Sequence, residues 1–326
     1  MANLQFLQQR IDEELKALKF PAYPKELYDP IQYVISIGGK RMRPVLLLMA
    51  CELFDGDIEK AIKPAMGIEL FHNFTLLHDD IMDNAPFRRT KPTVHNKWNA
   101  NVAILSGDTM FVKSCSLMIQ TDDKIVRKVL NTFNDTAIQV CEGQQLDMNF
   151  ETSNKVAIPQ YLKMIELKTA VLLAASLKIG ALIGGAREED AQLLYEFGKN
   201  IGIAFQLQDD ILDVYGDEEK FGKQKGGDII SNKKTYLLLK SMELASLNRY
   251  VQENLQQWIY APQFDAAEKV EAVTSIYDSL GVRNMAEQEM TKYYEQGLNF
   301  LNSIPVHEEK KNELIAFADS LMVRQV

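Results

Sequence analysis

The sequence predicts an all-α fold, and three observations support this prediction. Apolar residues recur at steps of three and four over most of the 326 residues, a spacing that places them on one face of an α-helix. Alternation of apolar and polar residues, the pattern of a half-buried strand, is nearly absent. The segments between the periodic stretches are short and rich in glycine, aspartate, asparagine or proline, which is typical of turns.

Each periodic stretch predicts one helix. Leu4, Leu7, Ile11, Leu15 and Leu18 mark the first, and further stretches cover residues 44–54, 64–82, 101–120, 125–149, 160–183 and 189–215. The breaks fall at residues 38–39, 55–57, 85–92, 121–123, 152–154, 184–185 and 222–232. None of them resembles a flexible linker, and the chain has no convincing tandem repeat, so we predict one all-α domain over residues 1–326.

Composition and charge limit the possible partners. The formal net charge is -9, which argues against nucleic acid or an anionic membrane surface as a general partner, because both require a basic field. The longest apolar stretch, residues 170–186, is interrupted by Ser176 and Lys178, which favours a buried helix over a membrane span. Residues 1–18 show no signal peptide.

The three cysteines, Cys51, Cys115 and Cys141, are odd in number, lie far apart and have apolar neighbours. We therefore expect reduced core residues in a cytoplasmic protein rather than disulfides or metal ligands.

An acidic pentad occurs twice, as Asp79-Asp80-Ile81-Met82-Asp83 and as Asp209-Asp210-Ile211-Leu212-Asp213. On a helix the first and last aspartates of each pentad lie about one turn apart on one face. Such a cluster in an apolar helix requires compensating cations. Mg2+ suits it, since this ion commonly takes one or two carboxylates and leaves positions for water and substrate phosphates. Both pentads lie near predicted helix ends, so we expect them to oppose each other across one cavity.

Basic residues gather in three places beside predicted loops, which is informative in an acidic chain. They are Lys40-Arg41-Met42-Arg43 after Gly38-Gly39, Arg88-Arg89 beyond the first pentad, and Lys223, Lys225, Lys233 and Lys234 beyond the second. Arginine forks grip phosphate oxygens, and lysines supply point charges. The polar segment 218–234 is a candidate mobile lid as well as an ordinary surface loop.

Several motifs follow one another in the order seen in the trans-isoprenyl diphosphate synthases, also called polyprenyl synthetases. They are the string from Gly38 to Pro44, the first pentad with Arg88-Arg89, Lys168-Thr169, the string from Phe205 to Asp210, and Lys223 with Lys233. The chain resembles this family, in its short-chain geranylgeranyl and farnesyl type, from about residue 30 to residue 240. The resemblance implies a helical bundle around a central cavity, the isoprenoid synthase fold, in a homodimer that condenses isopentenyl diphosphate with an allylic diphosphate using Mg2+.

The resemblance also implies roles for individual residues. Asp79 and Asp83 would bind two Mg2+ ions and Asp209 a third, with Asp80, Asp210 and Asp213 completing or orienting the set. The allylic diphosphate would be held by Arg88, Lys168, Gln206, Lys223 and Lys233, and the diphosphate of the isopentenyl substrate by Lys40, Arg43, His72 and Arg89. Thr169 and Gln206 would polarise the allyl-oxygen region. Gln144 and Asp147 would lie behind the residues that touch substrate.

The implied chemistry agrees with the residue types. Neutralising a diphosphate with dications and basic side chains makes it a leaving group, and the resulting allylic cation is attacked by the neighbouring alkene. The released diphosphate can accept the proton, so no Ser-His-Asp or Cys-His set is required.

Two positions depart from the family pattern. Thr90 stands after Arg88-Arg89, where the family usually has glycine. Lys234 stands where the family usually has a small residue, which leaves open whether Lys233 or Lys234 contacts substrate.

Product length is predicted from the bulk of residues before the first pentad. Phe74 and Thr75 stand five and four positions before Asp79, and an aromatic residue at the Phe74 position resembles producers of C15 to C20 chains. We expect a C20 product ahead of C15, with Phe71 and the helix around residues 110–114 contributing to the floor. The alternatives are that Phe74 is an ordinary core residue and that the product is a longer polyprenyl chain.

Other functions remain open on the residues alone. A terpene cyclase would not need the second diphosphate site of Lys40, Arg43, His72 and Arg89. A non-catalytic partner subunit should have lost carboxylates from one pentad, and both pentads are intact. A Mg2+-dependent phosphohydrolase would release phosphate without forming a carbon-carbon bond.

Overall fold

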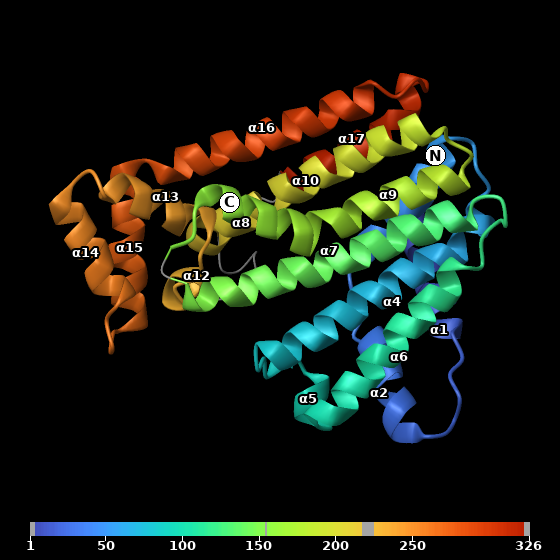
Figure 1. Ribbon diagram of the computed structural model, residues 1–326, viewed down its shortest axis with the longest axis horizontal. Helices are drawn as coiled ribbons and strands as arrows, with labels where there is room; N and C mark the ends of the chain where they lie inside the picture. Colours follow the sequence, from blue (N-terminus) through green and yellow to red (C-terminus); the bar gives the residue numbers. More distant parts are fainter. Residues whose placement is uncertain (1–3, 154, 217–224, 323–326) are drawn as a thin grey trace. The chain divides into compact units, whose positions relative to one another are not determined.

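The structure is a computed structural model that describes residues 4–153, 155–216 and 225–322. Within these ranges it is almost entirely helical, with one two-stranded hairpin of two-residue strands, so the all-α prediction is confirmed (Figure 1). The chain divides into two compact units, each assembled from segments that are not contiguous in the sequence. The prediction of one domain over residues 1–326 stays a prediction.

The first unit comprises Met1–Asp135, Ala175–Tyr195 and Ile304–Glu313. Its own elements are α1 (Leu4–Ala17), α2 (Lys25–Ser36), α3 (Met42–Leu53), α4 (Ile58–Met82), β1 (Phe87–Arg88), β2 (Lys91–Pro92), α5 (Val94–Lys97) and α6 (Ala100–Met118). Helix α4 is buried on all sides along residues 64–71, which is the pattern of a central helix. It packs along α6, as Figure 1 shows, and it carries the first pentad at its C-terminal end.

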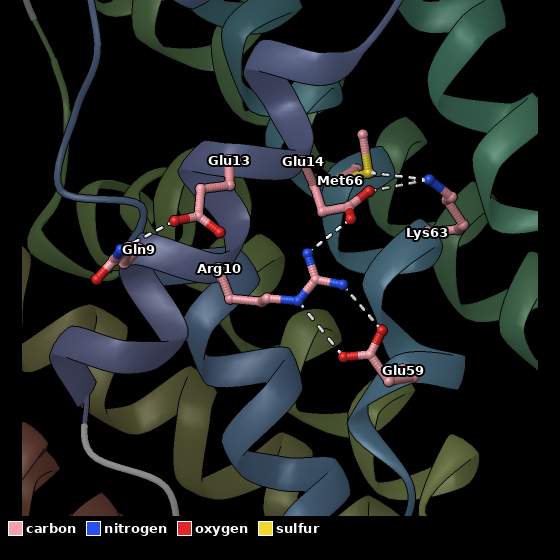
Figure 2. A network of polar contacts seen from close by, with 7 residues as sticks. All are labelled: Gln9, Arg10, Glu13, Glu14, Glu59, Lys63 and Met66. Carbon is pink, nitrogen blue, oxygen red and sulfur yellow. Dashed lines mark hydrogen bonds and ion pairs between the residues drawn. The ribbon is translucent and has the colours of Figure 1, made fainter.

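A polar network fixes α1 on α4 at the other end of the same helix (Figure 2). The Arg10 guanidinium lies 2.6 Å from a Glu14 carboxylate oxygen and 2.9 Å from one of Glu59. Lys63 lies 3.2 Å from Glu14. Partly exposed ion pairs of this kind contribute little singly and more as a network, so α1 is held over the first turns of α4.

The second unit comprises Thr136–Ala174, Glu196–Ser303 and Leu314–Val326. Its own elements are α8 (Ile158–Ile165), the π-helical turn η1 (Glu166–Ala170), α12 (Gly227–Ile230), α13 (Tyr236–Ala245), α14 (Arg249–Ile259), α15 (Ala266–Leu280) and α16 (Val282–Asn302). Four further helices contribute residues to both units: α7 (Val126–Thr152), α9 (Val171–Ile183), α10 (Glu188–Tyr215) and α17 (Glu308–Met322). The core of the second unit includes Leu207, Ile211 and Tyr277.

Two expectations are corrected. The single helix predicted over residues 160–183 is divided into α8, η1 and α9, because a π-helical turn leaves the apolar periodicity almost unchanged. The cysteines are free thiols, but only Cys51 is buried; Cys115 is half-buried and Cys141 is exposed, so Cys141 is not a core residue. No helix in the described ranges combines the length and apolar character needed to cross a membrane.

Candidate active site

The first pentad lies at the C-terminal end of α4, and its members differ in exposure. Asp79 is half-buried in the last turn, and Asp83 is the exposed residue that follows the helix. Asp80 is buried, and both of its oxygens lie 2.9 Å from the Arg88 Nε atom, which donates to them. A second guanidinium nitrogen of Arg88 is 2.7 Å from Asp80 and 4.0 Å from Asp79. Asp80 therefore orients Arg88, while Asp79 and Asp83 have greater access to solvent.

Arg88 and Arg89 lie on a hairpin whose turn has an unusual backbone. Strands β1 and β2 pair Phe87 with Pro92 and Arg88 with Lys91, leaving Arg89 and Thr90 as a two-residue loop. Both have positive φ, 50° and 65°, as a type I′ turn requires. The departure at Thr90 therefore places a β-branched residue where glycine is favoured.

The Arg89 side chain reaches back to the glycine pair before Lys40. Its guanidinium donates to the carbonyl oxygen of Gly38. A Cβ atom at residue 39 would lie 2.6 Å from a guanidinium nitrogen of Arg89. A side chain at residue 39 would make the flexible Arg89 side chain shift, so Gly39 leaves room for the approach that brings Arg89 to the other predicted isopentenyl diphosphate residues.

Arg43 and His72 meet beside Arg89. A guanidinium nitrogen of Arg43 is 3.0 Å from His72 Nε2, so Nε2 accepts and the imidazole is neutral. Burial, and then the charges of Arg43 and Arg89, hold the pKa of His72 well below its ordinary value. The Nε atom of Arg43 is buried without a hydrogen-bond partner in the described part of the chain. The arrangement is a positively charged cluster suited to an anion; Lys40 is exposed nearby in sequence.

Arg41, which the sequence analysis grouped with Lys40 and Arg43 without giving it a role of its own, differs from these neighbours. It is 4% exposed and has a φ of 49°. Its guanidinium donates to Glu69 at 2.6 Å, to Asp12 at 2.9 Å and to the Ile35 carbonyl oxygen at 3.0 Å. Burial opposes its charge, but the two carboxylates raise its pKa. Arg41 therefore fixes the start of α3 against α1, α2 and α4.

Four phenylalanines cluster on α4, α6 and α7 within the first unit. The rings of Phe74 and Phe111 stack, with centroids 5.3 Å apart and 19° between planes. Phe71 and Phe133 are buried, with ring centroids 5.2 Å apart, and Phe71 contacts both members of the stack. Phe111 places the helix around residues 110–114 beside Phe74, its contribution to product length stays a prediction, and Phe133 was not anticipated. The Thr75 hydroxyl donates to the His72 carbonyl oxygen in its own helix.

The second pentad lies in the last two turns of α10, in the second unit. Asp209 and Asp213 are half-buried, and Asp213 accepts a hydrogen bond from the Asp228 backbone N–H at 2.9 Å. Asp210 is buried; it accepts from the Tyr161 hydroxyl and from the Tyr236 backbone N–H at 3.2 Å. Burial, together with the charge of Asp228, raises the pKa of Asp210 to about 7. As in the first pentad, the middle aspartate is held by protein groups.

Lys168 and Thr169 lie in the π-helical turn η1, a feature often found at functional sites. The Lys168 ammonium lies 2.6 Å from Asp147 on α7, and the Thr169 hydroxyl is 3.4 Å from the Gln206 side-chain oxygen. A Cβ atom at residue 143 would lie 2.2 Å from the Lys168 backbone nitrogen. Gly143 therefore allows α7 and η1 to approach, and Asp147 contacts a predicted site residue as expected.

The remaining predicted residues have contrasting positions. Lys233 is exposed and its charge lowers the pKa of Asp210, whereas the Lys234 ammonium donates to the Asn232 carbonyl oxygen in its own loop at 3.4 Å. Lys223 lies outside the described residues. Gln144 is half-buried on α7. The opposition of the two pentads across one cavity stays a prediction.

In the described residues, no three His, Cys, Asp or Glu side chains are grouped as a metal site. The donors at each pentad are nonetheless carboxylate oxygens one helical turn apart, the type that Mg2+ prefers. Asp79, Asp83, Asp209 and Asp213 are the pentad members that have partial or full exposure, so they fit an ion that also binds substrate phosphate oxygens.

The chain is similar to known proteins over most of its length. The family model of polyprenyl synthetase matches residues 24–278. The chain is 37% identical over 320 residues to a geranylgeranyl diphosphate synthase of Methanosarcina mazei, covering 97% of this chain and 94% of that protein. It is 38% identical over 253 residues to a geranylfarnesyl diphosphate synthase of Natronomonas pharaonis, covering 72% and 73%.

Solved structures extend the match to the fold. A crystal structure of a geranylgeranyl pyrophosphate synthase superposes with a TM-score of 0.94 and 41% identity, covering 100% of both chains. The sequence motifs, the family model and this fold all point to one class of enzyme, the isoprenyl diphosphate synthases, which are prenyltransferases. The chain belongs to the polyprenyl synthetase family.

Proposed function

We propose that this enzyme condenses isopentenyl diphosphate head-to-tail with allylic diphosphates to give an all-trans C20 diphosphate, with C15 as the shorter alternative. The observation that carries the proposal is the basic cluster of Arg43, His72 and Arg89 in the first unit. A reaction with only one diphosphate substrate has no use for an anion site separate from the metal-binding carboxylates. A coupling enzyme needs it for the second substrate.

The isopentenyl diphosphate is held by Lys40, Arg43, His72 and Arg89. The neutral His72 accepts from Arg43, which leaves the other guanidinium donors of that arginine for phosphate oxygens. Arg89 is fixed by its bond to Gly38, so its charge is in place before substrate binds. Such preorganisation reduces the entropy lost on binding.

The allylic diphosphate is held by Arg88, Lys168, Gln206, Lys223 and Lys233, with three Mg2+ ions held by Asp79, Asp83 and Asp209. Bound Mg2+ supplies the charge neutralisation that makes diphosphate a leaving group. Asp80 is buried and orients Arg88, and Asp210 is buried and bonded to the Tyr161 hydroxyl and the Tyr236 N–H, which fixes the last turns of α10. Asp213 completes the second set.

Gln206 and Thr169 direct their polar atoms toward one another at 3.4 Å. In the reaction they polarise the bond between allylic carbon and oxygen and stabilise the positive charge that develops there. The alkene of the isopentenyl substrate attacks that carbon, the new carbon-carbon bond forms, and a proton passes to the departing diphosphate.

Product length is limited by the stacked pair of Phe74 and Phe111, which is backed by the buried Phe71 and Phe133. Thr75 adds bulk next to Phe74. An aromatic pair resists displacement by a growing apolar chain because its rings are supported from behind. This supports C20 over products of C30 and beyond.

The enzyme acts as a homodimer in the cytoplasm. Supporting the dimer, Leu105, Val112 and Ile119 recur seven residues apart along α6 and its C-terminal end, and they are 60%, 64% and 54% exposed. Residues at that spacing share one face of a helix. A second copy of the chain is the proposed occupant of this face, and sedimentation of wild type against Val112→Arg tests it.

The reaction itself is tested by incubating the protein with labelled isopentenyl diphosphate, Mg2+ and each of the C5, C10 and C15 allylic diphosphates. Label in an extended prenyl diphosphate that disappears with a chelator supports the proposal. Release of inorganic phosphate without coupling, or a cyclised hydrocarbon product, would overturn it.

A further inference from the structure

Lys269, on the first turn of α15, is an unusual residue because it is 1% exposed. Its ammonium donates to the Ile230 carbonyl oxygen at 3.2 Å and to the Asn232 side-chain oxygen at 2.8 Å. It also lies 4.1 Å from the centroid of the Phe264 ring, a cation–π contact. Burial lowers its pKa. Burying a lysine costs free energy, and the two hydrogen bonds and the cation–π contact of Lys269 offset that cost.

What Lys269 holds is the turn after α12. Asn232 has a φ of 55°, a conformation that a non-glycine residue adopts at a cost. Its side-chain oxygen accepts from Lys269, and its side-chain nitrogen donates to the Ile259 carbonyl oxygen at 3.0 Å. The amide is therefore fixed from both sides, by α15 and by the end of α14.

The next residue is Lys233, and its backbone is fixed as well. The Lys233 N–H donates to the Asp228 carbonyl oxygen at 2.9 Å. The segment around it is anchored on the second pentad at both ends: the Gly226 N–H donates to the Asp213 carbonyl oxygen at 2.7 Å, and the Tyr236 N–H donates to Asp210. Between these anchors, Lys269 contributes the side-chain contacts from α15.

We propose that Lys269 is a positioning residue for Lys233: by bonding to Ile230 and Asn232 it fixes the turn that presents Lys233 to the allylic diphosphate. The inference rests on the proposed function, in which Lys233 binds that diphosphate. Residues 226–234, which are part of the predicted lid segment, then form a fixed support for the second pentad.

Lys269→Met tests the proposal, because methionine preserves most of the apolar volume and cannot donate hydrogen bonds. We expect the KM for the allylic diphosphate to rise about 10- to 100-fold, the range for a misplaced binding group. The KM for isopentenyl diphosphate should stay within about twofold, because Lys233 is not assigned to that substrate.

Two further variants separate positioning from a general loss of stability. Val273→Ala removes a buried side chain one turn along α15 and retains the two hydrogen bonds that Lys269 donates to the turn. At a loss of melting temperature matched to that of Lys269→Met, it should leave the allylic KM unchanged. Lys233→Ala should raise the allylic KM, and adding Lys269→Met to it should have no further effect, because coupled residues are non-additive.

The outcomes are distinct. Suppose that Lys233→Ala raises the allylic KM. The positioning role is then wrong, and the proposed function stands, if Lys269→Met has a normal allylic KM, if its effect adds to that of Lys233→Ala, or if Val273→Ala has the same effect. If Lys233→Ala itself has wild-type kinetics, the assignment of Lys233 to the diphosphate fails and the inference fails with it.

Discussion

Phe74 on α4 and Phe111 on α6 are stacked with ring centroids 5.3 Å apart, and both side chains are only half-buried. Phe71 and Phe133 lie behind them and are fully buried. The difference in burial divides the cluster into two pairs. Under the proposed function, the partly exposed pair faces the growing chain and the buried pair supports it as core.

Phe74→Ala should therefore lengthen the product beyond C20, and Phe111→Ala should do the same, because each removes one ring of the stack. Phe71→Leu is the control: it keeps apolar bulk in the supporting layer and should leave the main product at C20. Products are measured by chromatography after removal of the diphosphate. An unchanged product distribution in both alanine variants would show that the stack is ordinary core.

Glu69 stabilises the site through Arg41. Both side chains are buried, so Glu69→Gln leaves a buried arginine with reduced compensation and should cost about 3–5 kcal/mol of unfolding free energy. Asp12→Asn removes the other, partly exposed carboxylate of Arg41 and should cost roughly 1 kcal/mol. Denaturant unfolding compares the two variants. Equal losses of unfolding free energy would indicate that burial of the Arg41–Glu69 pair does not determine its contribution to stability.

Thr90→Gly should stabilise the protein. Thr90 has a φ of 65°, which costs a residue with a Cβ about 1–2 kcal/mol, and the added chain entropy of glycine offsets part of this gain. We expect a net gain of about 0.5–1 kcal/mol, read as a higher melting temperature. Thr90→Ala lacks the hydroxyl and the γ-methyl group but retains the Cβ, so its gain should be smaller than that of Thr90→Gly. Equal gains in the two variants would attribute the effect to the γ atoms instead of the Cβ.

His72 should make stability depend on pH in the absence of diphosphate. Its folded-state pKa is held well below the ordinary 6.5, first by burial and then by Arg43. The unfolded chain therefore binds the proton first, and stability is lost as pH falls below about 6.5, by up to ~1.4 kcal/mol per pH unit. The measurement is unfolding free energy from pH 7.5 to pH 5.5. His72→Gln retains an acceptor without titrating and should lose less; equal slopes would contradict this account.

The helices were predictable because apolar periodicity reports burial directly, and both pentads fall at helix ends as their flanking turns indicate. The sequence did not show that the aspartates of each pentad have two different environments. The middle aspartates, Asp80 and Asp210, are buried against Arg88 and Tyr161, and a partner 49 positions away leaves no local signal in the sequence.

Other site features depend on backbone detail that periodicity does not encode. The π-helical turn that holds Lys168 adds one residue to a helix without altering its apolar face, although Gly143 opposite it is a signal of close packing. Arg41 belongs to the same basic string as Lys40 and Arg43, yet it points inward because Glu69 and Asp12 are there. A string of like charges cannot show which member is buried.

The most direct test of this account is the chain length that the wild-type enzyme makes from isopentenyl diphosphate and the C15 allylic diphosphate with Mg2+. We predict a C20 diphosphate as the main product, lost on chelation, and a shift to longer chains in Phe74→Ala. A main product of C30 or longer from the wild type would contradict the role of the Phe74–Phe111 stack.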